Sequence, residues 1–140
     1  MKTNLPEIEI IFIAATRNEG EKGYNFLRTS GKLEENFRIV PKYWVAGKDK
    51  EQLNLKDDNI LIAFAENKND FDKIRPDLSH FIKLKHRYLF SSKEEARTWV
   101  TEVPDSGFRV FIGLKDETAL GFRDILNSAI PNTTSGVKNF

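Results

Sequence analysis

Polar side chains that could hold a ligand follow four apolar stretches of this 140-residue chain, each with the pattern of a strand. In an open α/β sheet, ligands bind beyond the carboxyl ends of the strands, where helix N-termini gather. The candidate ligand-binding residues at these ends are Arg17, Asn18, Glu66, Asn67, Lys93 and Lys115. Arg17, Lys93 or Lys115 would hold an anion such as the phosphate of a nucleotide. We therefore expect a shared cleft lined by Arg17, Glu66 and Lys115.

Three acids, Glu66, Asp70 and Asp72, follow the apolar stretch at residues 60–65. Mg²⁺ prefers one or two carboxylates together with water, so Glu66 and Asp70 are candidate metal ligands, and either could act as a base. Acids in the first turn of a helix also stabilise its dipole without any ligand. The sequence therefore predicts no metal and no cofactor, with Mg²⁺ at Glu66 and Asp70 as the alternative.

Recognisable catalytic motifs are missing from the sequence. The chain has no cysteine, which excludes disulfides, zinc–thiolate sites and thiol nucleophiles. The glycine-containing segment 17–23 matches neither phosphate-binding motif, and its two glutamates would repel a phosphate. His80 and His86 lack the spacing of a two-histidine metal site on a helix, and no G-x-S-x-G sequence is present. The residue types leave open whether the chain is an enzyme.

A cationic strand is predicted at residues 81–90, where apolar and basic residues alternate. Lys83, Lys85 and Arg87 would share one face with neighbours about 6.6 Å apart, which is twice the rise per residue. This face is a candidate interaction surface, although charges on a strand also discourage edge-to-edge pairing. A single-stranded nucleic acid could lie along it if Tyr88 or Trp44 stacked with bases.

The elements that would position these residues alternate along the chain. Strands are predicted at 7–15, 37–46, 60–65, 81–90 and 108–114. Helices are predicted to begin at Asn18 with Glu21, at Asn69 or Asp70, at Ser92 with Glu95, and at Asp116. Apolar side chains on both faces predict buried positions at Ile11, Ile13, Ile60, Ile62, Phe64, Val110 and Ile112. Pro41 cannot donate to a ladder, which favours an edge position for the second strand.

Strands separated by helical patterns favour an α/β fold with about five strands in a mostly parallel sheet and helices on its faces. An α+β fold in which strands 37–46 and 60–65 form a hairpin is the alternative. We expect residues 1–6 to form a flexible arm, residues 7–130 a single α/β domain, and residues 131–140 a flexible tail after a proline.

Composition separates the possible functions only coarsely. The net charge is +1, but cations concentrate in residues 73–93, where Asp77 is the lone acid. Such asymmetry can steer a partner, which favours a non-catalytic regulatory or protein-interaction module. The alternative is a domain that binds or hydrolyses a nucleotide or another phosphorylated molecule at the strand ends. The longest apolar run, at residues 10–15, is too short for a membrane span, and we expect a cytoplasmic protein.

Overall fold

Helices and strands alternate in the computed structural model, which describes residues 5–47, 55–56, 58–103 and 107–130. The strands are β1 (Glu7–Ala14), β2 (Arg38–Val45), β3 (Ile60–Phe64), β4 (His86–Ser91) and β5 (Arg109–Ile112). The helices are α1 (Arg17–Ser30), α2 (Lys68–Ile74), α3 (Ala96–Trp99) and α4 (Asp116–Ala129), with 3₁₀ turns η1 (Leu33–Glu35), η2 (Arg75–Phe81) and η3 (Val100–Glu102). This order confirms the predicted α/β class.

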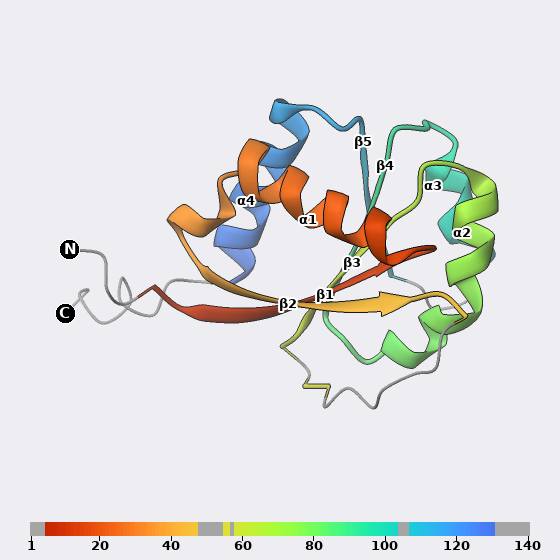
Figure 1. The fold of residues 1–140 in the computed structure, drawn as a ribbon, viewed down its shortest axis with the longest axis horizontal. Coiled ribbons are helices and arrows are strands. Elements are labelled where there is room, and N and C mark those ends of the chain that lie inside the picture. The colour runs from red at the N-terminus through yellow and green to blue at the C-terminus, as the bar shows by residue number, and fades with distance from the viewer. Residues whose placement is uncertain (1–4, 48–54, 57, 104–106, 131–140) are drawn as a thin grey trace.

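The five strands form one parallel sheet in the order β2-β1-β3-β4-β5 (Figure 1). Strand β1 lies between β2 and β3 and runs parallel to both, so the alternative with a hairpin between the second and third strands is wrong. Strand β2 lies at the edge that Pro41 predicted. Parallel neighbours cannot be joined by a tight hairpin, so the connections between them must cross over the sheet. The helices on the two faces of the sheet form such crossovers.

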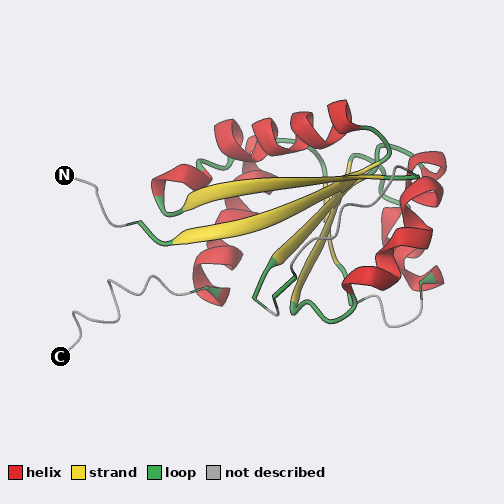
Figure 2. Ribbon diagram, turned by 60° about the horizontal axis from the view of Figure 1, so that its bottom comes forward, coloured by secondary structure: helices red, strands yellow, loops and turns green. Residues whose placement is uncertain are grey.

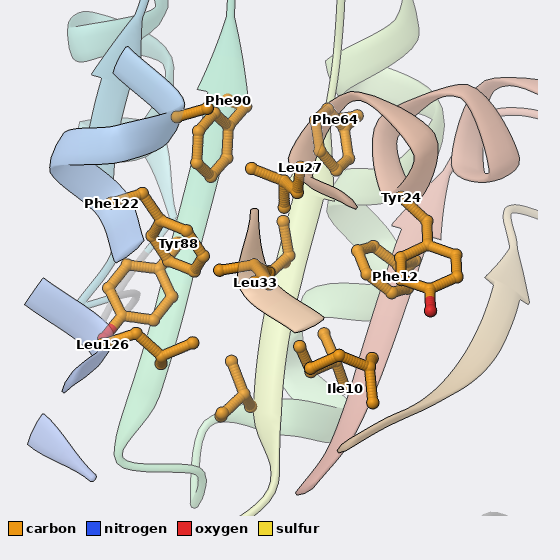
Figure 3. Close-up of a cluster of buried hydrophobic side chains, with 14 of the residues drawn as sticks. Ile10, Phe12, Tyr24, Leu27, Leu33, Phe64, Tyr88, Phe90, Phe122 and Leu126 are labelled. Carbon is orange, nitrogen blue, oxygen red and sulfur yellow. The ribbon is translucent and has the colours of Figure 1, made fainter. Parts of the chain in front are cut away.

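Helices lie on both faces of the sheet (Figure 2), and each face has its own hydrophobic core. The α1/α4 core joins Ile10, Phe12, Ile62, Phe64 and Phe90 of the strands to Leu27 of α1 and Phe122 of α4 (Figure 3). The α2/α3 core joins Ile11, Ile13, Leu61 and Leu89 to Phe71 of α2 and Trp99 of α3. Alternate residues of β1 and β3 thus enter different cores, which explains why these strands are apolar throughout.

The residues predicted to be buried are buried, except for the two in the last strand. Ile11, Ile13, Ile60, Ile62 and Phe64 are buried, whereas Val110 and Ile112 are only partly buried. The prediction is wrong for these last two residues because β5 is an edge strand of four residues, with a neighbour on one side only.

The predicted strand at 81–90 is wrong in its first half. Residues 75–81 form η2, and the Leu84 N–H donates to the carbonyl of Phe81 in a turn before β4 begins at His86. Phe81 and Leu84 are buried three residues apart, as a tight helical turn allows, while Ile82 is 46% exposed. Lys83 and Lys85 therefore lie outside the strand and do not form one strand face with Arg87.

The predicted helix caps are also displaced. The Thr16 hydroxyl accepts from the Glu19 N–H at 3.1 Å, and the Asn67 side chain accepts from the Asp70 N–H at 2.8 Å, so α1 and α2 begin earlier than predicted. Helix α3 has no side-chain cap at its first turn, and Ser91 rather than Ser92 accepts from the Lys93 N–H. The residue before α4 is Lys115, also without a side-chain cap. In α1 and α2 the cap is the first Thr or Asn after the preceding strand, and its backbone is extended.

The predicted terminal segments fall mostly beyond the described ranges. Residues 1–4 of the expected arm and the whole expected tail, 131–140, lie outside the described residues. The Pro6 carbonyl accepts a hydrogen bond from the Arg38 N–H at 2.8 Å, so the end of the arm is attached to β2. None of the helices in the described ranges has the length and apolar character that crossing a membrane requires.

Glycines allow α1 to pack closely on the sheet. Both Gly20 and Gly23 are buried, and a Cβ at Gly20 would lie 3.2 Å from a ring carbon of Tyr43. A Cβ at Gly23 would overlap the ring of Phe64 on β3. Both glycines lower the helix propensity of α1. At Gly23, the close contact with Phe64 of β3 explains why the residue cannot carry a side chain.

Replacing Gly23 by Ala should therefore destabilise the protein by about 1–3 kcal/mol through overpacking against Phe64, despite the better helix propensity of Ala. Gly121 in α4 is the matched control, because a Cβ there meets no atom within 4 Å. Gly121→Ala should stabilise by about 0.5–1 kcal/mol. Urea unfolding of both variants measures the difference, and equal stabilisation would show that α1 does not pack this closely.

Candidate functional site

The sheet topology places a switch point between the carboxyl ends of β1 and β3. Strand β1 leads into α1 on one face of the sheet and β3 leads into α2 on the other, so the two loops separate at this edge. Such a switch point is where parallel sheets most often bind ligands. Four of the predicted ligand-binding residues, Arg17, Asn18, Glu66 and Asn67, come from these two loops or the helix turns that follow them.

Carboxyl groups gather at the switch point between β1 and β3. Burial raises the pKa of Glu19, and a hydrogen bond to Asp70 together with the charges of Asp70 and Glu66 raises it further, while the Thr16 hydroxyl lowers it. Two carboxyls that share a hydrogen bond need a proton between them, so the Glu19–Asp70 pair favours a protonated carboxyl. Sequence reasoning missed Glu19, although the spacing of Thr16 and Glu19 matches a capping box.

The acidic hollow is a cavity of about 60 Å³ beside these carboxyls. Its lining combines Phe26, Phe64, Ala65, Phe90 and Leu114 with Glu19, Lys22, Gly23, Glu66 and Ser91. Leu114 is 41% exposed, which leaves an apolar side chain at the surface. Small-molecule sites usually enclose roughly 300–1,000 Å³, so this hollow has room for a small chemical group and not for a whole nucleotide.

The cations expected in the cleft do not line it. Arg17 pairs with Glu21 at 3.0 Å, and its guanidinium lies 4.2 Å from the ring centre of Tyr43 on β2. Lys93 and Lys115 are exposed, and neither lines the acidic hollow among the residues that the structure describes. These contacts hold Arg17 over the edge strand, and the expected meeting of Arg17, Glu66 and Lys115 in one cleft stays a prediction.

The remaining candidates at this edge have structural contacts of their own. The Asn67 side chain caps α2, Asn18 is exposed on α1, and Asp72 pairs with Lys68 at 3.0 Å. Within the described ranges, no three histidine, aspartate or glutamate side chains are arranged to hold a metal ion. Glu66 and Asp70 stay close to Glu19, which makes this edge acidic.

A second and larger hollow lies at the opposite edge, where β4 and β5 begin. The basic hollow has a volume of about 590 Å³. Its lining consists of Lys85, His86, Arg87, Tyr88, Gly107 and Arg109 on the sheet side and Asp124, Ile125, Ser128 and Ala129 on α4. The basic stretch at residues 73–93 signals it in the sequence, but only the pairing of β4 with β5 adds Arg109.

Burial and neighbouring charges shift the pKa values of His86 and Tyr88 in the basic hollow. Burial lowers the pKa of His86, as does the charge of Lys85, while Asp58 opposes them, so the imidazole is neutral at pH 7. Burial raises the pKa of Tyr88, and the charge of Arg109 lowers it in part, so the phenol keeps its proton. The Arg87 side chain packs directly against Gly107. Cationic charge in this hollow thus comes from lysine and arginine alone.

The stacking surface expected for a nucleic acid is not formed. Tyr88 belongs to the α1/α4 core and Trp44 to the α2/α3 core, so the two rings lie on opposite faces of the sheet. Their exposed fractions are 5% and 9%. The Trp44 indole N–H also donates to the Asp77 carboxylate at 3.0 Å, which ties β2 to η2.

Comparison with known proteins assigns no family to the chain. No protein-family model matches it, and no curated protein matches its sequence. The function is therefore argued from the chemistry of the acidic and basic hollows.

The Glu19–Asp70 contact predicts how stability changes with pH. A glutamate whose pKa is raised on folding gives its full stabilisation below the ordinary value of 4.5 and loses it as the pH rises through the folded value. Glu19→Gln removes this loss, and the amide can still take part in the capping box. Relative to wild type, the variant should gain stability as the pH rises from the ordinary value of 4.5 through the folded pKa of Glu19.

Unfolding free energies measured by urea titration at several pH values test this prediction. Glu117→Gln is the control, because Glu117 also lies in the first turn of a helix and is exposed. Curves of Glu19→Gln and wild type that stay parallel over the whole range would show that burial and Asp70 do not raise the pKa of Glu19 in solution.

Proposed function

We propose that the protein is a non-catalytic binding module that holds an anionic partner or ligand in the basic hollow. The observation that carries the proposal is that Lys85, which directly precedes β4, and Arg109 of β5 line one hollow of about 590 Å³. This volume lies within the roughly 300–1,000 Å³ of small-molecule sites. Both cations are exposed, and neither has an ion-pair partner within the described ranges.

The alternative function, binding or hydrolysis of a phosphorylated molecule at the carboxyl ends of the strands, has weaker support. A phosphate there would meet the carboxyl groups of Glu19, Glu66 and Asp70 and only one lining cation, Lys22. Like charges at this distance repel, and the hollow is too small for a nucleotide. The geometry therefore favours the basic hollow. We further propose a cytoplasmic location, because the cysteine-free chain needs no disulfide.

Binding of inorganic pyrophosphate at low salt tests the proposal. The wild-type protein should bind it, with NMR shifts at residues 85–88, 107–109 and 124–129, and rising salt should weaken the binding. The double variant Lys85→Ala/Arg109→Ala should bind about ten- to a hundredfold more weakly, because two charge-assisted contacts are lost.

Lys83→Ala is the matched control, since Lys83 is exposed, lies two residues from Lys85 and does not line the basic hollow. Its affinity should stay within about twofold of wild type, because an exposed charge outside the hollow contributes little. Equal losses in both variants, or shifts centred on Glu19 and Glu66, would contradict the proposal. Unchanged circular dichroism establishes that the variants are folded.

A further inference from the structure

The two walls of the basic hollow differ in chemistry. The sheet wall includes the cationic residues Lys85 and Arg109, while the α4 wall includes the acidic residue Asp124 and the hydroxyl-bearing Ser128. Ile125 and Ala129 add apolar residues to the α4 wall. An occupant that satisfies both walls needs an anionic end, an apolar middle and a group that donates hydrogen bonds.

We propose that the occupant is a nucleoside monophosphate, an inference that rests on the proposed anion-binding function. Its phosphate contacts Lys85 and Arg109, and its sugar hydroxyls or base amino group donate to Asp124. Its sugar and base rest on Ile125 and Ala129. The exposed carboxylate of Asp124 lies 3.7 Å from the Arg123 guanidinium and keeps lone pairs for further donors.

The positions of the two cations suit a single phosphate. Arg109 is the partner of Tyr88 in the β4–β5 ladder, and Lys85 directly precedes the first residue of β4. Both residues line the same hollow, so their two long side chains can close around one compact anion. The planar fork of Arg109 also matches a phosphate with two parallel hydrogen bonds.

An acidic protein segment fits the same hollow less well. Its successive carboxylates would bring negative charge against Asp124, which a nucleoside avoids because its sugar and base are neutral donors. The neutral imidazole of His86 adds a donor and an acceptor and no further cation. The charge pattern therefore favours a ligand that is anionic at one end only.

Calorimetric titration of the full chain tests the inference with defined probes. These are the monophosphates of adenosine, guanosine, cytidine and uridine, the four free nucleosides, inorganic phosphate and a poly-glutamate peptide. At least one monophosphate should bind about tenfold or more tightly than its nucleoside, inorganic phosphate or the peptide, because it uses both walls.

Variants then assign each wall to its part of the ligand. Arg109→Ala should weaken the monophosphate and inorganic phosphate alike, whereas Asp124→Ala should weaken the monophosphate severalfold and leave inorganic phosphate unchanged. Lys83→Ala is the control and should change neither. All three positions lie outside the buried cores, and circular dichroism verifies the fold of each variant.

Each contrary result overturns a different part of the argument. If all monophosphates bind no better than inorganic phosphate and Asp124→Ala changes nothing, the nucleoside assignment is wrong and the anion-binding function stands. Poly-glutamate that binds more tightly than every monophosphate and depends on Arg109 would replace the nucleotide by a protein partner. Absence of any binding that depends on Lys85 or Arg109 would overturn both the inference and the proposed function.

Discussion

The pairing of β1 with two parallel neighbours is the constraint on which the architecture depends. Its ladders to β2 and β3 leave no edge of the strand free, and its side chains are apolar on both faces, so helices must cover both faces. Helix α1 covers one face closely enough that Gly23 meets the ring of Phe64. Since α2 covers the other face, the loops after β1 and β3 separate at the carboxyl edge, and the strands begin together at the opposite edge (Figure 1).

The acidic hollow and the basic hollow lie at opposite edges of the sheet, and helix dipoles give a physical reason for their charged residues. Helices α1 and α2 begin at the carboxyl edge, where their N-termini favour acids such as Glu19 and Asp70. Helix α4 ends beside the amino edge, where a C-terminus favours cations such as Lys85 and Arg109. The acids can thus be explained by capping and dipole effects, whereas the size of the basic hollow exceeds what helix stabilisation requires.

Local sequence patterns predicted the fold class and most of the core. Apolar runs on both faces of β1 and β3 identified parallel strands, because only a doubly covered strand tolerates them. The same approach was wrong at residues 81–85, where apolar spacing of two and of three residues coincide and Leu84 completes a turn instead of a strand. It also displaced the helix starts, because Thr16 and Asn67 offered earlier caps than the residues predicted.

The sequence by itself determined the alternation of elements, the covered strands and the cationic character of residues 73–93, since each depends on neighbours along the chain. Only the tertiary structure decided the strand order and the residues that share a site. Arg17 turned toward Tyr43, Glu19 met Asp70 across the switch point, and Arg109 came to line the same hollow as Lys85. These contacts join segments distant in sequence, and they follow from crossover connections that local periodicity does not encode.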